Sequence, residues 1–243
     1  MVSGTYPHLR RAPITEAILD INVAPSVNVE ATSEFARRVA ATHPQVLPLK
    51  TTMVLVSADA KQTPLAHSIV GQICWNEGKT RAVQARINGF TVNHVRNYQS
   101  WESLRDEAHP LWDEYISVMR PAKVCGLGLR YINRIAVPPF GEFGQYVNTH
   151  PQVGPGLPQN VRNFFMRVEL PFSAKHTAFL SQTIIPPDLD TAEPGLILDI
   201  HAVSSQEFDP GSPQIWNELD QLREIKNACF FGSVKEQTWR KYE

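Results

Sequence analysis

The chain has 243 residues, 42% hydrophobic and 19% charged, and its 23 Lys and Arg balance 24 Asp and Glu to a formal net charge of −1. That near-neutral balance excludes a generic nucleic-acid coat, which needs a strong basic excess, but it allows a local basic patch. Three widely separated cysteines without a C-x-x-C pair indicate reduced thiols, and the sequence shows neither a signal peptide nor a stretch of ~18 apolar residues. We therefore expect a globular cytoplasmic protein without membrane contact.

The first half of the chain is predicted to begin with a strand and to end with a long helix. The expected strands are 17–23, 51–57, 68–76 and 82–95, with a helix between the first two. The pair Asn88-Gly89 interrupts the last strand and is typical of a tight hairpin turn. Ser100 is the expected N-cap of the long helix, and Pro110 should kink or divide that helix.

The second half is predicted to repeat this order. The expected strands are 129–137, 163–171, 177–185 and 196–203, with a helix after the first and loops at 151–158, 186–194 and 204–211. The closing helix should begin with Ser212 as N-cap and Pro213 at its first position, and Gly232 should end it. Its apolar stripe comprises Ile215, Leu219, Leu222 and Cys229.

A short internal repeat suggests duplication. Residues 42–46 read THPQV and recur at 149–153, and both long helices carry W-x-x-L near their starts. We predict an α+β fold of two similar β-α-β-β-β-α halves, 1–120 and 121–243, packed tightly on one another. Short links between strands favour a mostly antiparallel sheet with helices packed on one face. The alternative is that helices and strands simply alternate and that the shared pentapeptide is a coincidence.

Arginines gather in stretches that lack acidic residues. The segment 129–135 reads LRYINRI, and strand alternation places Arg130 and Arg134 on one of its faces. An arginine-rich sheet face suits a phosphate, a carboxylate or an acidic protein surface. The candidate binding residues are Arg86, Arg130, Arg134 and Arg167. The competing interpretation is that Asp20, Glu169 and Asp199 form structural ion pairs with these arginines across the sheet.

Motifs for catalysis or metal binding are missing from the sequence. It contains no H-E-x-x-H, no His/Cys cluster at metal spacing and no G-x-S-x-G. His43 and His150 each precede a proline and are interpreted as marking helix ends, and no base can be named for Cys125 as a nucleophile. We therefore predict no catalytic residue, no metal and no cofactor.

Four segments resemble, in the same order, a known protein family. They are Pro13-Ile14-Thr15-Glu16-Ala17, Gly89-Phe90 with Asn93, Y-x-S-W-E at 98–102, and L-R-Y-I-N-R-I at 129–135. The chain resembles an uncharacterised, sporadically distributed family of bacterial proteins of about this length, although residues 226–231 match its closing helix only loosely. The family has no established activity, and its distribution implies accessory genes, such as those for phage defence or toxin control.

These observations lead us to expect a non-enzymatic binding or regulatory protein that recognises a protein partner. One alternative is a nucleotide or nucleic-acid binder that uses the same arginines, for which affinity should fall steeply with salt. Another is a hydrolase with an unrecognised site. Assembly as a homodimer is left open.

Overall fold

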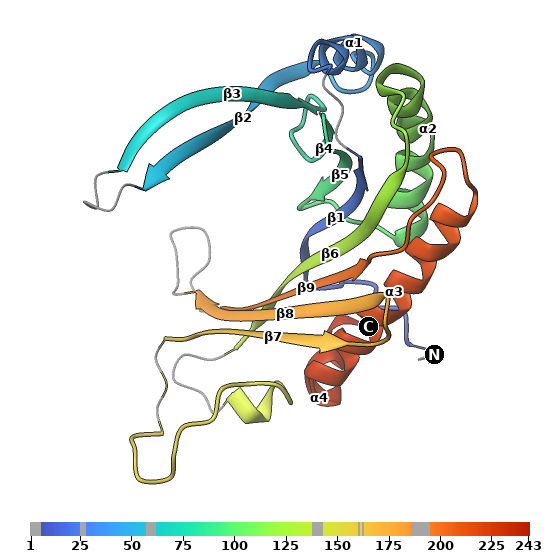
Figure 1. Cartoon of the computed structure of the whole chain (residues 1–243). Helices are drawn as coiled ribbons and strands as arrows, with labels where there is room; N and C mark the ends of the chain where they lie inside the picture. Colours follow the sequence, from blue (N-terminus) through green and yellow to red (C-terminus); the bar gives the residue numbers. More distant parts are fainter. Residues whose placement is uncertain are drawn as a thin grey trace. The chain divides into compact units, whose positions relative to one another are not determined.

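The computed structural model describes residues 6–24, 28–56, 62–137, 143–159, 161, 163–185 and 195–243, with the backbone alone over 52–56 and 62–67. Nine strands follow the order β2-β3-β4-β5-β1-β6-β9-β8-β7 in one sheet, shown in Figure 1. The strand pairs whose register is described are all antiparallel. The predicted α+β class with a mostly antiparallel sheet is confirmed.

The elements alternate between runs of strands and single helices. The strands are β1 Ile14–Val23, β2 Gln45–Val56, β3 Gln62–Trp75, β4 Arg81–Arg86, β5 Gly89–Val95, β6 Val124–Ala136, β7 Phe165–Pro171, β8 His176–Ile185 and β9 Gly195–Ser204. The helices are α1 Glu30–Arg38, α2 Trp101–Met119, α3 Gln214–Ser233 and α4 Glu236–Trp239, with 3-10 turns η1 Phe143–Gln145 and η2 Arg240–Tyr242.

The chain divides into two compact units. Unit 1 comprises residues 1–18, 127–206 and 213–243, and unit 2 comprises 19–126 and 207–212. Three segments, 1–18, 121–126 and 207–212, thus belong to the other unit relative to the predicted halves, 1–120 and 121–243.

Unit 2 is built around a cluster of aromatic rings between its helices and strands. Helix α1 contacts β3 and β4, and α2 contacts β5 and α1 (Figure 1). The ring of Phe90 lies 5.5 Å from those of Trp112 and Tyr115, and Phe35 lies 6.2 Å from Tyr115, measured between centroids. These rings are buried, and such pairs add to the free energy gained from burying apolar surface.

The start of α2 follows the prediction, but its interior does not. Ser100 accepts a hydrogen bond from the Ser103 amide at 3.1 Å and caps the helix. The helix runs unbroken through Pro110, so the expected division is wrong. A proline inside a helix costs about 3 kcal/mol. Burial of a large apolar side chain returns roughly 1.5–3 kcal/mol each, and Leu111 and Trp112 are both buried beside the proline.

The hairpin predicted at Asn88-Gly89 is present with different turn residues. Ile87 and Asn88 form the turn, and Gly89 is the first residue of β5. No glycine among the described residues has a positive φ, so the left-handed conformation typical of an Asn-Gly turn is not what Gly89 provides. A Cβ at this position would lie 3.0 Å from the Ile21 carbonyl oxygen and 2.6 Å from Arg86 Nη2. Gly89 therefore permits a close approach of these groups.

Unit 1 contains the strand order β6-β9-β8-β7, with α3 in contact with β8 and β9 (Figure 1). Side chains alternate along strand β9: Leu196, Leu198 and Ile200 are fully buried, while Ile197 and Asp199 between them are not.

Two details of α3 were predicted incorrectly, and one predicted helix is shorter than expected. The N-cap position is Pro213, which has no side-chain oxygen to offer, so Ser212 is not the cap. Gly232 lies inside the helix, which ends at Ser233 because Val234 becomes extended. Between β6 and β7 the described residues contain only the short turn η1. The loop 151–158 has no helix or strand, and the expected loop 186–194 lies outside the described residues.

Candidate functional site

The predicted arginines of unit 1 share the face of its sheet that α3 does not cover. Across β6, β9 and β8, Arg130 pairs with His201 and His201 pairs with Phe179. Arg134 lies four residues after Arg130 on β6, so its side chain is on the same side of the strand. Arg167 pairs with Ser181. Because side chains alternate along a strand, these residues point to one side. We call this side of β6-β9-β8-β7 the arginine face.

The opposite side of the same strands packs against α3. Lys226 of α3 lies over the ring of Tyr131, with Nζ 4.2 Å from its centroid. Tyr131 alternates with Arg130 along β6, and it is fully buried. The two sides of this sheet therefore differ as predicted, one apolar and covered by a helix, the other carrying arginines.

Arg130 is held in an ion pair. Its Nε and Nη2 donate to the two carboxylate oxygens of Asp199 at 2.8 and 2.6 Å, and 43% of its side chain is exposed. Hydrogen bonding to Asp199 raises the pKa of Arg130 above its usual value. A two-pronged pair of this kind neutralises the guanidinium, which is the structural alternative considered for this residue.

Arg167 has a different environment. Its guanidinium carbon lies 4.7 Å above the centroid of the Phe179 ring, which in turn lies 6.3 Å from the His201 ring. Arg167 is exposed, and no carboxylate in the described part of the chain forms an ion pair with it. Phe165 shares its side of β7 and is 73% exposed. A cation stacked on an aromatic ring keeps its N–H groups available to a partner.

Arg134 and Arg86 are placed differently again. Arg134 lies against Gly195, where a Cβ would come within 2.9 Å of its Nε. Arg86 belongs to unit 2, where its Nη2 donates to Asp20 at 2.8 Å and its Nη1 donates to Thr91. The Asp20 and Arg86 side chains are 24% and 21% exposed. Arg86 and Asp20 thus form a second structural ion pair across the sheet, which was the alternative interpretation of these arginines.

A cluster of ionisable groups in unit 2 was missed by the sequence analysis. Glu107 of α2 accepts from His94 of β5 at 2.7 Å and pairs with Arg81 of β4 at 3.2 Å. His43 Nε2 lies 3.7 Å from the other carboxylate oxygen. His43 does follow α1, as expected, since its amide donates to Val39 at 2.9 Å. No short spacing links these residues, because packing alone brings them together.

Burial and charge shift the pKa values in this cluster. Burial raises the pKa of Glu107, but the hydrogen bond from His94 and the charges of His94, Arg81 and His43 outweigh it and hold the pKa below its usual range. Burial lowers the pKa of His43, with Arg81 and His94 adding to that effect against Glu107. His43 Nε2 and His94 Nδ1 are buried without a hydrogen-bond partner. An ionised side chain without a partner in this cluster would therefore lower the stability of the fold.

Unit 1 contains a chain of polar contacts that resembles a catalytic arrangement. Ser173 Oγ lies 2.9 Å from His176 Nδ1, and His176 Nε2 lies 2.6 Å from Glu218 of α3. Yet Ser173 Oγ also accepts the backbone amides of Lys175 and His176 at 3.1 Å each. A hydroxyl oxygen has two lone pairs, so neither is left to attack a substrate. These contacts between Ser173, His176 and Glu218 fasten the turn between β7 and β8 to α3.

Lys226 is a half-buried amine on the sheet side of α3. Burial and then the charge of Arg223 lower its pKa to about 7. It forms no ion pair among the residues that the structure describes. Lys226 and Glu218 both interrupt the apolar stripe predicted for α3, four residues after and four before Leu222. Charged residues at stripe positions are the signal that could have identified both groups.

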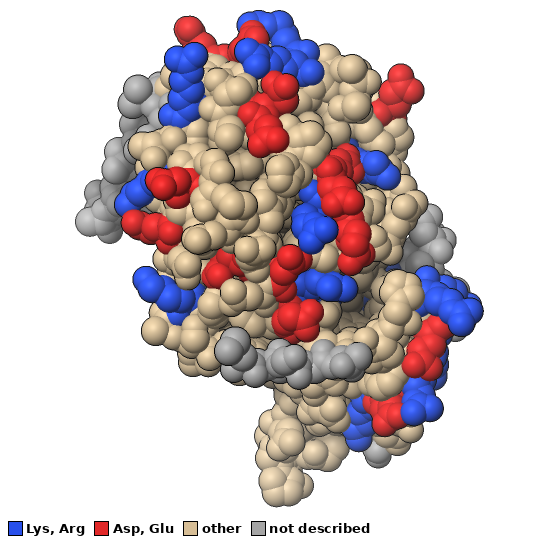
Figure 2. All heavy atoms as spheres, turned by 90° about the vertical axis from the view of Figure 1, so that its right-hand side faces the viewer, with Lys and Arg blue, Asp and Glu red and all other residues tan. Residues whose placement is uncertain are grey.

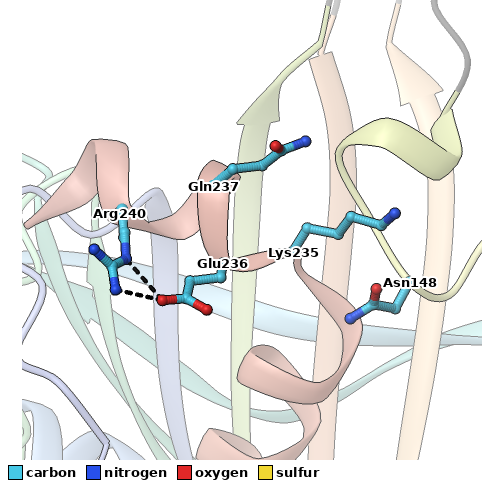
Figure 3. Close-up of a pocket in the computed structure, with 5 residues that line it drawn as sticks. All are labelled: Asn148, Lys235, Glu236, Gln237 and Arg240. Atoms are coloured by element: carbon cyan, nitrogen blue, oxygen red, sulfur yellow. Dashed lines mark hydrogen bonds and ion pairs between the residues drawn. The ribbon is translucent and has the colours of Figure 1, made fainter.

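One pocket of about 590 Å³ lies beside α4 in unit 1. Figure 3 shows its lining residues, Asn148, Lys235, Glu236, Gln237 and Arg240. Arg240 donates to Glu236, Gln237 to the Gln145 carbonyl and Asn148 to the Gly232 carbonyl. These side chains are mostly satisfied by the protein itself, which leaves Lys235 as the main cation of the pocket.

Known protein families and curated sequences give no relative from which the function of this chain could be inferred. Comparison with models of known protein families gives no match, and comparison with curated protein sequences gives no significant match. Among the described residues, no helix is long and apolar enough to cross a membrane, and no group of three or more His, Cys, Asp and Glu could hold a metal ion. Figure 2 shows basic and acidic side chains interspersed on the side that faces right in Figure 1, without a field of one sign.

Proposed function

We propose that this chain is a non-enzymatic binding or regulatory protein that recognises a protein partner through the arginine face of unit 1. The observation that carries the proposal is Arg167, an exposed guanidinium stacked on Phe179 and free of a carboxylate partner among the described residues. Exposed Phe165 lies beside it on the same side of β7. Arginine and aromatic residues are enriched where protein interfaces bind most strongly.

The partner surface should combine acidic and apolar groups. Arg130 is already neutralised by Asp199, which leaves Arg167 and the neighbouring rings as the recognition elements. The phosphate groups of a nucleotide or nucleic acid would be bound more strongly by several unpaired cations that surround one phosphate. This difference favours a protein partner over a nucleotide or nucleic acid, which stays the alternative.

The proposal predicts unequal contributions from the arginines. Arg167→Ala and Phe165→Ala should each weaken partner binding at least tenfold, as expected of a residue at an interface centre. The double substitution of Arg130 and Arg134 to Ala should weaken binding less than Arg167→Ala, because Arg130 is already paired with Asp199. The matched control is Arg37→Ala, which removes an arginine that is 72% exposed on α1 of unit 2. Unchanged affinity in folded Arg167→Ala and Arg130→Ala/Arg134→Ala proteins, measured by calorimetry, would reject the arginine face.

We also propose that the two long helices and their strands arose by duplication. In support, the first strand of each half is the neighbour of the last strand before the long helix: β1 is next to β5, and β6 is next to β9. The strands then follow in reverse chain order, β4-β3 in the first half and β8-β7 in the second. Strand β2 is the additional one. The resemblance to a sporadically distributed bacterial family further suggests service in an accessory system such as phage defence or toxin control.

A further inference from the structure

Strand β7 is the last strand in the sheet order, so one of its edges has no partner strand among the described residues. Its side chains are mostly exposed, including Phe165 at 73% and Leu170 at 39%. Free edges with exposed apolar residues pair readily with another strand. The nature of that other strand can be deduced from the backbone direction and sequence of β7.

The backbone groups at the free edge belong to alternate residues. The Phe172 amide donates to the His176 carbonyl of β8 at 2.9 Å. In an antiparallel ladder every second residue bonds to the same neighbour, so Leu170, Val168 and Met166 also direct their amides and carbonyls toward β8. Arg167 and Glu169 consequently direct theirs toward the free edge.

The sequence of β7, FMRVELP, is complementary to itself when a second copy runs antiparallel and Val168 faces the partner's Val168. Arg167 then lies opposite Glu169 of the other copy, twice by symmetry, with outward backbone groups meeting outward backbone groups. On the other face Met166 lies opposite Leu170. Opposite charges and apolar residues in facing positions stabilise a strand pair, and like charges destabilise it.

Other registers are less favourable. Backbone bonding allows only shifts of two residues, because a shift of one would set outward groups against inward ones. One such shift places Arg167 opposite Arg167, and the other places Glu169 opposite Glu169. Pro171 has no amide hydrogen and ends the ladder at that side. Charge and backbone together therefore select one register.

We propose that β7 is a self-association edge, through which two copies of this chain pair antiparallel about Val168 with Arg167–Glu169 contacts between the copies. The pairing is two-fold symmetric and closes on itself, since each copy contributes the same edge. Seven residues a side make a small interface, so the dimer is weak and reversible. This inference does not depend on the proposed partner binding.

Charge reversal tests the register directly. Arg167→Glu and Glu169→Arg each place like charges together twice, so each should weaken dimerisation of the full chain by roughly tenfold or more. The double variant Arg167→Glu/Glu169→Arg restores both opposite-charge contacts and should dimerise like the natural chain. An equimolar mixture of the two single variants should form a mixed dimer, because both contacts between residues 167 and 169 of the two copies then join opposite charges. Sedimentation velocity over a range of concentrations, with folding checked by circular dichroism, provides the measurement.

The outcomes separate self-association from partner binding. Restored dimerisation in the double variant with lost partner binding supports the edge, because that variant lacks Arg167. A natural chain that stays monomeric at every concentration would overturn the inference. So would single variants that dimerise unchanged, or a folded double variant that does not recover.

A covalent measurement covers the case in which a charge variant fails to fold. Val168→Cys, in a Cys125→Ser background, should form a disulfide between copies on mild oxidation, since residues facing each other at a non-hydrogen-bonded position are close enough for that bond. Leu157→Cys in the same background is the control, at a position 60% exposed on a loop of unit 1. Equal cross-linking of the two cysteines would contradict the proposed register.

Discussion

Each long helix carries a carboxylate on the side that faces its unit's strands, but the two carboxylates have different partners. Glu107 is half-buried, with 16% of its side chain exposed, and Glu218 is buried. Glu107 in unit 2 faces His94, Arg81 and His43, groups that carry or can acquire positive charge. Glu218 in unit 1 faces His176 and the hydroxyl of Ser204. The comparison shows that charge compensation stabilises the Glu107 carboxylate, whereas hydrogen bonds contribute much of what stabilises the Glu218 carboxylate.

The largest effect should come from neutralising Glu107. Glu107→Gln leaves Arg81 and two buried histidines without their anion, and we expect a loss of about 3 kcal/mol in the free energy of unfolding. Urea denaturation at neutral pH measures it. Glu114→Gln is the control on the same helix, because Glu114 is 46% exposed and pairs with Arg38 at the surface. Equal losses in the two variants would contradict the role of burial.

A smaller effect is expected at Glu218. The amide of Glu218→Gln can still bond with Ser204 and His176, so the expected loss is about 2 kcal/mol. The same denaturation series measures it. A loss larger than that of Glu107→Gln would reverse the comparison between the two units.

Replacing Lys226 should raise the free energy of unfolding, whereas replacing Glu107 or Glu218 should lower it. Its folded pKa of about 7 lies below its usual 10.5, so between these values the unfolded chain binds more protons, and stability rises with pH across that window. Lys226→Met removes the half-buried charge and should stabilise the protein near pH 7 by about 1 kcal/mol. Thermal unfolding at several pH values is the measurement. A variant that is less stable near pH 7 would show that the ammonium contact with Tyr131 outweighs its burial.

The smallest effect concerns the pH dependence of unit 2. The pKa of His43 is lowered from 6.5 and that of Glu107 from 4.5. In both cases the unfolded chain takes up protons first as pH falls, so stability declines with acidification, starting near 6.5 for His43. His43→Gln should flatten the decline just below that pH by less than about 1 kcal/mol. His109→Gln, which removes a histidine that is 54% exposed on α2, is the control variant.

The strands and helices were more predictable than the candidate site, because they depend on residues close together in the sequence, whereas the site depends on contacts between residues far apart in it. Alternation and turn residues are local, and they identified the strands that became β4, β5, β7, β8 and β9. Ser100 was identified because its partner Ser103 is three residues away. The cap of α3 was missed because Ser212 and Pro213 offer two plausible starts one residue apart.

The candidate site depends on contacts that alternation alone cannot rank. The sequence placed Arg130 and Arg134 on one side of a strand, and the register confirms this. It could not distinguish Arg130, which pairs with Asp199 of β9, from Arg167, which lies on Phe179 of β8. Which neighbour each arginine meets is decided by strand order, and local patterns do not specify that order.

The most direct test of the central claim is capture of tagged full-length protein from native-host lysate, with the eluate analysed for both protein and nucleic acid. Our account predicts a stoichiometric protein partner that is retained by Arg37→Ala and lost from folded Arg167→Ala. Recovery of nucleotide or nucleic acid without protein, released steeply by added salt through counterion uptake, would contradict it.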